Sequence, residues 1–140
     1  MTEKAFVDTN VLVYAYDHDS GGKHEVAERL LRDLWPEKAG VLSPQVLQEF
    51  YVTVTRKITL PLAKEAARRI VNLYAAWCVE ISAADILAAF QIEDQAQISF
   101  WNALIVASAR RAGAERIVSE DLNAGQTIAG IRIENPFASI

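Results

Sequence analysis

The sequence predicts an α/β fold, in which a mostly parallel β-sheet is covered by helices on both faces. Short apolar runs alternate with amphipathic stretches of helical length along nearly the whole chain. Such alternation is typical of parallel strands joined by crossover helices. The chain has 140 residues, of which 51% are hydrophobic, and it contains no repeat or long linker. We therefore expect one domain over residues 1–140.

The first half of the chain alternates strands and helices. A buried strand is predicted at 4–7, where an apolar run ends at an acid. Helices are predicted at 10–16 and 23–35 from the spacing of their apolar residues. A short strand at 41–42 is followed by Ser43-Pro44, a strong helix start with Ser as the N-cap and Pro at the first helical position.

The second half continues the alternation. Pro61 is expected to start a helix that ends near Trp77, because Pro favours the first turn of a helix. The remaining expected elements are strands at 78–81, within 115–119 and at 131–133, and helices at 82–95 and 99–112. The helix at 99–112 has a serine cap, a basic end and a stopping glycine.

Composition and charge exclude several classes of protein. A formal net charge of −4 argues against a bulk electrostatic nucleic-acid binder, so any contact with nucleic acid must be local. Cys78 is the single cysteine, which rules out an intrachain disulfide and a zinc site of cysteines. No apolar run approaches the roughly 20 residues that a bilayer requires, and the N-terminus lacks a signal-peptide core. We expect a cytoplasmic protein with no membrane association.

Two acids occur where α/β folds place their sites, near the carboxyl ends of parallel strands, and two polar residues on helices could join them. Asp8 ends the first strand and Asp121 ends a later one. Glu49 lies on the flank of the apolar stripe of its helix, and Asn102 lies in the first turn of the helix before the Asp121 strand. Together they could converge on one point. Carboxylate oxygens suit Mg²⁺ or Mn²⁺, and a cation would relieve the repulsion between crowded carboxylates.

Each of these residues also has a structural interpretation. Asp8 is a possible helix N-cap, and Glu49 could form a solvated pair with Arg56 or Lys57. Asp121 could cap or turn residues 122–125, with Glu120 as a competing acid. Asn102 could close a capping box with its helix N-cap, because an amide three residues after the cap can reach back to it.

Four stretches in order along the chain resemble one family. FVDTNVLVY, SPQVLQEF, SFWNALIVASARRAG and IVSEDLNAG together resemble the PIN-domain nucleases, and the likeness is nearest to the VapC-type toxins of bacterial toxin–antitoxin pairs. The resemblance spans essentially the whole chain. It implies an α/β/α sandwich with a parallel sheet and a Mg²⁺- or Mn²⁺-dependent endoribonuclease acting on RNA. It also implies a cognate antitoxin and a homodimer.

The resemblance assigns roles to particular residues. It implies that Asp8, Glu49 and Asp121 are catalytic metal ligands. Residue 102 completes the set, and the flanking polar residues that orient the carboxylates or a metal-bound water would be Thr9, Asn10 and Ser119.

Asn102 departs from the pattern of the family, which usually has Asp at this place in an SFWDALI motif. The change exchanges a charged ligand for a neutral one, so metal binding is expected to weaken and catalysis to slow. A second hypothesis follows from it: a catalytically weak or inactive PIN-like module that binds RNA or an antitoxin. A third is a phosphotransfer hydrolase with Asp8 as the nucleophile, although the second Asp that such enzymes need is replaced by Asn10.

A few residues are candidates for contacts outside the acidic set. Arg56-Lys57 and Arg68-Arg69 are expected on solvated faces and are the best local candidates for phosphate contact. Trp101 is expected to be packed or to face a second subunit rather than to stack on RNA.

Overall fold

A computed structural model of the chain describes residues 3–122 and 124–140. These residues form a five-stranded sheet with the strand order β2-β1-β3-β5-β4. The strands are β1 (Ala5–Val7), β2 (Gly40–Val41), β3 (Arg116–Val118), β4 (Thr127–Ile128) and β5 (Ile131–Glu134). All neighbouring pairs are parallel except β4 with β5. The prediction of an α/β fold with a mostly parallel sheet is confirmed.

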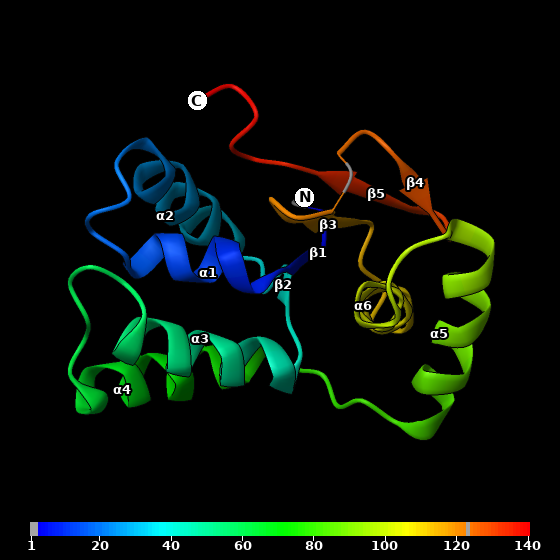
Figure 1. Cartoon of the computed structure of the whole chain (residues 1–140), viewed down its shortest axis with the longest axis horizontal. Coiled ribbons are helices and arrows are strands. Elements are labelled where there is room, and N and C mark those ends of the chain that lie inside the picture. The colour runs from blue at the N-terminus through cyan, green and yellow to red at the C-terminus, as the bar shows by residue number, and fades with distance from the viewer. Residues whose placement is uncertain (1–2, 123) are drawn as a thin grey trace.

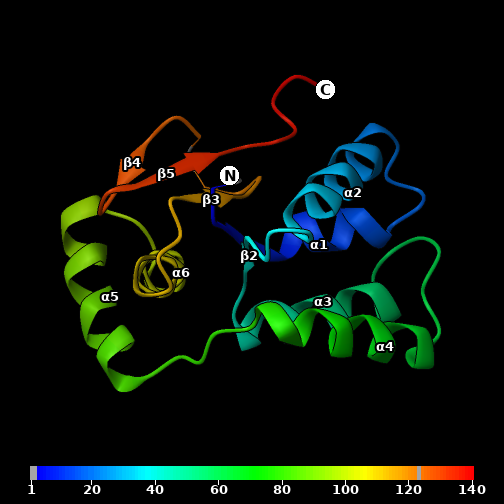
Figure 2. The same ribbon diagram turned by 180° about the vertical axis from the view of Figure 1, so that it is seen from behind.

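Helices surround the sheet in two groups. They are α1 (Thr9–Tyr16), α2 (Gly22–Leu34), α3 (Pro44–Arg56), α4 (Lys64–Tyr74), α5 (Ala83–Ala96) and α6 (Phe100–Arg111), with a 3₁₀ turn, η1, at Ala75–Trp77. Figure 1 shows α1 to α4 to one side of β1 and β2, and α5 and α6 to the other. The reverse view in Figure 2 shows the same division. In the described part of the chain, no helix is both long and apolar enough to cross a membrane.

The centre of the sheet is buried on both faces. All three residues of β1 are inaccessible to solvent, as expected for a parallel strand with helices on either side. Val7 pairs with Val118 at the carboxyl ends of β1 and β3, and the Asp8 backbone N–H donates to the Val118 carbonyl over 3.1 Å. Residues that follow β1 and β3 therefore leave the sheet side by side.

The predicted Ser43 cap is present, and the start of α5 has a capping box that was not predicted. The Ser43 hydroxyl accepts a hydrogen bond from the Val46 backbone N–H, and Pro44 occupies the first turn of α3. Ser82 and Asp85 form a capping box at the start of α5. Serine side chains thus satisfy backbone donors that have no partner within the helix.

Two of the predicted elements are wrong. The helix expected from Pro61 begins only at Lys64, because the Leu62 N–H donates to the Val54 carbonyl and keeps the preceding chain extended. The strand expected at 78–81 is reduced to a single bridge between Leu42 and Cys78. After that bridge the chain leaves the sheet toward the start of α5.

Strand β4 was not predicted. It pairs antiparallel with β5 through a two-residue loop, Ala129-Gly130, in which both residues have positive φ angles of 51° and 83°. Such loops match the twist of a hairpin but usually carry Asn-Gly or Gly-Gly. Because alanine stands at the first loop position, the usual sequence pattern of a two-residue hairpin loop is missing, although Ile128 and Ile131 flank the loop as hairpin strands would.

Candidate active site

Asp8 and Ser119 meet at the carboxyl edge of the sheet. Because β1 and β3 are in parallel register, the Ser119 hydroxyl donates to Asp8 Oδ2 over 2.7 Å. The Thr9 backbone N–H donates to Asp8 Oδ1 over 2.8 Å, so Asp8 is also the N-cap of α1, as its structural interpretation predicts. Asp8 is only 8% exposed. Both of its oxygens are thus held by neutral donors.

The pKa of Asp8 lies above its usual range. Burial is the main cause, because it penalises the charged carboxylate. The hydrogen bonds from Ser119 and Thr9 act in the opposite direction, and the negative charges of Asp121 and Glu49 raise the pKa further. The electrostatic influence of those two acids on Asp8 indicates that the three carboxylates share one region of the protein.

Glu49 faces this region from α3. The Thr9 hydroxyl donates to Glu49 Oε2 over 2.9 Å, and the Gln45 amide donates to Oε1 over 3.0 Å. Gln45 lies one helical turn before Glu49, where side chains on the same face meet. Among the described residues, neither Arg56 nor Lys57 forms an ion pair with Glu49, so the predicted solvated pair is absent there.

The adjacent acids Glu120 and Asp121 have different surroundings. The Asn10 amide nitrogen donates to Asp121 Oδ2 over 3.1 Å, while its carbonyl oxygen accepts from the Glu120 backbone N–H over 3.1 Å. The Glu120 side chain instead forms an ion pair with Lys23 and accepts from the Tyr14 hydroxyl over 2.7 Å. Burial raises the pKa of Glu120, but these two partners more than offset it and lower the pKa overall. Glu120 therefore does not compete with Asp121 for the site.

In its alternative role, Asp121 would cap or turn residues 122–125. That stretch includes Asn123, which lies outside the described residues. Within the described part, the Asp121 backbone N–H donates to the Ser119 hydroxyl over 3.1 Å. Ser119 thus links the backbone at Asp121 to the carboxylate of Asp8.

Asn102 has half of the predicted capping interaction. Its backbone N–H donates to the Ser99 hydroxyl over 3.2 Å, which confirms Ser99 as the N-cap of α6. Its side-chain amide makes no hydrogen bond with any residue that the structure describes. The amide is therefore free to face the acids, which it adjoins in the cavity described next.

One cavity of about 120 Å³ collects the predicted residues. Its lining consists of Asp8, Thr9, Ser43, Gln45, Val46, Glu49, Trp101, Asn102, Ile105 and Asp121. The four predicted ligands thus come together, with Asn10 and Ser119 behind them as hydrogen-bond partners. Trp101 is 59% exposed at the rim, so it is not buried within one chain, and its expected contact with a second subunit stays a prediction.

The donor set fits a hard divalent cation in kind. The candidate ligands are carboxylate and amide oxygens, which Mg²⁺ and Mn²⁺ prefer, and the carboxylates have only neutral hydrogen-bond donors as described partners. Across residues 3–122 and 124–140, no group of three or more acidic, His or Cys side chains is close enough to form a ready ligand shell. The carboxylates would have to draw together around a cation.

The family is decided by sequence. A model of the PIN domain matches residues 5–127. The chain belongs to the PIN domain family. No curated protein matches it in sequence.

Solved structures share the fold of this PIN domain. A toxin–antitoxin complex from Klebsiella pneumoniae is 17% identical, with a TM-score of 0.71 over 96% of this chain and 98% of that one. VapC20 of Mycobacterium tuberculosis, described as a toxin that cleaves the sarcin–ricin loop, is 23% identical with a TM-score of 0.58 over 81% and 87%. The DNA-bound VapBC of Salmonella typhimurium is 18% identical with a TM-score of 0.66 over 96% and 99%.

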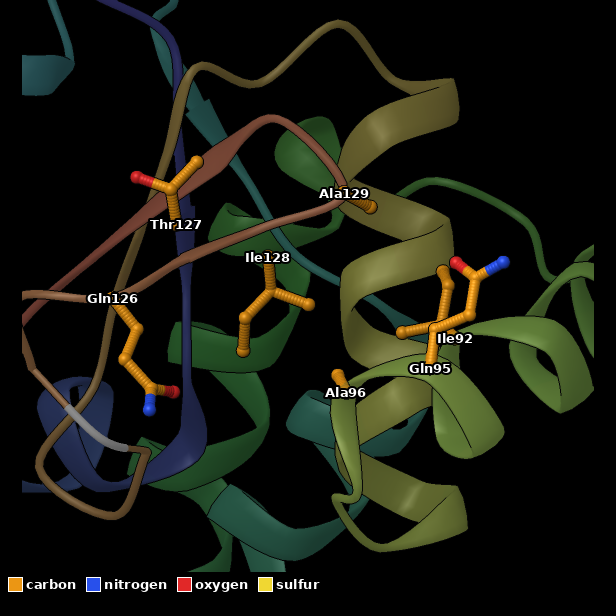
Figure 3. A pocket seen from close by; sticks show the side chains of 7 residues that line it. All are labelled: Ile92, Gln95, Ala96, Gln126, Thr127, Ile128 and Ala129. Atoms are coloured by element: carbon orange, nitrogen blue, oxygen red, sulfur yellow. The ribbon is translucent and has the colours of Figure 1, made fainter.

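The PIN domain has a further hollow away from the acids. It measures about 380 Å³ and lies between the end of α5 and β4 (Figure 3). It is lined by Ile92, Gln95, Ala96, Gln126, Thr127, Ile128 and Ala129, with Ile128 projecting from the strand toward α5. None of these side chains titrates, so the lining has no group for acid–base chemistry and no charged metal ligand.

Sequence reasoning missed the role of Gln45 at the site of the PIN domain. Gln45 fixes one oxygen of Glu49 and lines the cavity. Its signal was the spacing of four residues from Glu49, which places the two side chains together on a helix. An amide at that spacing is too common on solvated helices to be selected from sequence alone.

Proposed function

We propose that this protein is a Mg²⁺- or Mn²⁺-dependent endoribonuclease of the VapC toxin type, with activity reduced by Asn102. The observation that carries the proposal is the cavity in which Asp8, Glu49, Asp121 and Asn102 come together at the carboxyl edge of the sheet. Three acids without a described cation beside them are suited to receive one. Membership of the PIN domain family supports the same site.

Asp8, Glu49 and Asp121 would hold the metal, with the Asn102 amide oxygen as a neutral fourth ligand. When bound, the metal would supply an activated water and stabilise the charge that develops on the phosphate. Thr9 orients Glu49, and Ser119 orients Asp8, through the hydrogen bonds described above.

Asn10 has a separate orienting role. It holds the backbone of Glu120 and the carboxylate of Asp121 with one amide group. Both contacts fix the loop after β3, so Asp121 is directed to the cavity while Glu120 is directed to Lys23. The phosphotransfer alternative requires an aspartate at position 10. An aspartate there could not donate a hydrogen bond to Asp121, so the contact that Asn10 makes disfavours this alternative.

The antitoxin and the homodimer are part of the proposal. Support comes from the shared fold with the structure described as a toxin–antitoxin complex from Klebsiella pneumoniae. A cognate antitoxin would have to block the acid cavity to silence the enzyme. We place the protein in the cytoplasm, where its RNA substrate is found.

A second candidate function is an RNA- or antitoxin-binding module without cleavage. Asn102 favours it, since a neutral amide at a ligand position weakens the hold on a cation. This module would bind its partner and leave RNA intact even with excess Mn²⁺.

The deciding experiment compares the protein with its Asn102→Asp variant, each freed of antitoxin, on a mixed RNA pool with Mg²⁺ or Mn²⁺. We expect the Asn102→Asp variant to cleave faster. Adding Asp8→Ala to each protein serves as the control and should abolish cleavage. Equal cleavage by both proteins would contradict the role of Asn102, and no cleavage by either would favour the binding module.

A further inference from the structure

A groove of about 450 Å³ adjoins the acid cavity along α3. It is lined by Thr9, Gln48, Glu49, Val52, Thr53 and Lys57. Thr9 and Glu49 belong to both hollows, and their hydrogen bond forms the shared wall. In Figure 1, α1 follows β1 and runs beside α3, so the two helices that carry Thr9 and Glu49 are neighbours. A chain that passes the acids can thus continue into the groove.

Lys57 gives the far end of this groove a positive charge. Its backbone N–H donates to the Thr53 carbonyl over 2.8 Å, which fixes the residue as the C-cap of α3. Of the described residues that line the groove or the acid cavity, Lys57 is the one cation. No acid in the described part of the chain forms an ion pair with it. This charge is therefore available to an anion from outside the chain.

We propose that this groove binds the nucleotide that flanks the scissile phosphate of a single-stranded RNA, with Lys57 on the flanking phosphate. The proposal rests on the proposed function for the substrate. Glu49 and Lys57 are eight residues apart in sequence, which is about 12 Å of helix rise. That separation places the two side chains at different points along the groove. The acids face the bond to be cut, and Lys57 holds the next part of the backbone.

The middle of the groove suits a base rather than a second phosphate. Val52 is 40% exposed and gives an apolar surface for one face of the ring. Gln48 and Thr53 offer a neutral amide and a hydroxyl, which can pair with the edges of unstacked bases. Glu49 disfavours a phosphate at its end unless a cation is bound. The arrangement therefore orders the strand as scissile phosphate, base and flanking phosphate.

The net charge of −4 makes this lysine important. A protein of net negative charge gains no overall electrostatic attraction to RNA, so each cation placed along the RNA path matters more. A single contact with a single strand contributes about 0.7 to the slope of log affinity against log salt concentration. The slope of log affinity against log salt concentration therefore reports how many phosphates the protein contacts. It does not depend on the folding stability of the protein.

The test compares Lys57→Gln with Arg56→Gln. Arg56 is the adjacent exposed cation on α3 and does not line the groove, so both variants lose one charge from the same helix end. Binding of a fluorescein-labelled single-stranded RNA pool is measured in EDTA over a series of salt concentrations. We expect Lys57→Gln to weaken binding about tenfold and to reduce the slope by about 0.7. Arg56→Gln and Lys57→Arg should retain the slope.

Equal effects of Lys57→Gln and Arg56→Gln would overturn the proposal, because the lysine would then act only through net charge. Competition with poly-glutamate distinguishes the other class of anion. If Lys57 governs binding of poly-glutamate and not of RNA, the groove receives an acidic protein segment and the proposal fails. Thermal unfolding of both variants should show the same small loss from the helix terminus.

Failure of the nuclease proposal would look different. If RNA binding depends on Lys57 but the Asn102→Asp variant does not cleave RNA, the groove proposal stands and the nuclease proposal fails. In a variant that does cleave, Lys57→Gln should raise KM about tenfold and leave kcat unchanged, because the flanking contact is made equally in the ground and transition states. A fall in kcat alone would contradict the assignment to substrate binding.

Discussion

Two buried aspartates differ in how their charge is balanced. Asp8 and Asp85 are 8% and 3% exposed, and each caps the start of a helix. Asp85 accepts from Arg111 over 2.7 Å, and this contact holds the pKa of Asp85 below its usual range despite burial. Asp8 has only neutral donors and two other acids nearby, and its pKa is raised. Asp85 is neutralised within the fold, whereas Asp8 is left for a cation from outside.

The largest expected effect is on RNA cleavage, for which Asp8 should be required and Asp85 should not. In the Asn102→Asp protein, Asp8→Asn should lower Mn²⁺-dependent RNA cleavage roughly a thousandfold, because a metal supplies several kcal/mol of charge stabilisation. Asp85→Asn, assayed at a temperature at which it is folded, should retain kcat. Cleavage by the Asp8→Asn protein at the parent rate would exclude Asp8 as a metal ligand.

The next largest effect is on the free energy of unfolding, which should change in opposite directions at Asp8 and Asp85. Asp85→Asn should lower the free energy of unfolding by about 2 kcal/mol, since it removes the ion pair with Arg111 and weakens the capping box. Asp8→Asn should raise the free energy of unfolding in metal-free buffer, because it removes a buried charge. Urea unfolding at neutral pH measures both, and a loss of equal size in the two variants would break the comparison.

The pH dependence of stability should have opposite signs at the two sites. The folded pKa of Asp85 lies below its unfolded value of about 3.9, so its contribution is complete above that value and is lost as the pH falls through the folded pKa. The folded pKa of Asp8 is raised, so its charge destabilises the fold above that pKa and the penalty disappears as the pH falls through it.

The midpoints of urea unfolding, measured for each variant and the parent from neutral pH to about pH 3, should show these two pH dependences. The deficit of Asp85→Asn relative to the parent should shrink toward acid, and so should the advantage of Asp8→Asn. An advantage of Asp8→Asn that grows toward acid would mean that Asp8 is stabilised as a carboxylate after all.

The smallest effect concerns the neighbours Glu120 and Asp121. Lys23→Met removes the cation beside Glu120 and should lower the free energy of unfolding only slightly, because both side chains of the pair are partly exposed. The control Lys64→Met removes an exposed cation at the start of α4 and should have no comparable effect. A loss from Lys23→Met as large as that from Asp85→Asn would indicate that this ion pair is structurally as important as that of Asp85.

The meeting of Asp8 with Ser119 was predictable because parallel strands bring their carboxyl ends to one edge. The spacing alone did not decide between Glu120 and Asp121, since both follow β3 within the same short loop, and the prediction of Asp121 came from the resemblance to the family. The difference depends on Asn10 and Lys23, which come from α1 and α2 and are distant in sequence. Only the packing of those helices beside the loop decides which acid faces the cavity.

The errors in secondary structure have local causes. A strand at 78–81 reads as apolar from sequence, yet Cys78 forms only one bridge before the chain turns toward α5. Pro61 is a good first helical residue, but the hydrogen bond from Leu62 to Val54 delays the helix. In both places a contact with a distant residue overrides a local preference, and such contacts cannot be read from a single chain segment.

The sheet ends at both edges in strands of only two residues, β2 and β4. An edge strand offers its unpaired backbone groups to any extended chain that approaches, and a long one can nucleate fibrils. Edges this short present few groups for such growth. A protein of this fold can therefore be concentrated beside its partners with little risk that its sheet will be extended by a second copy.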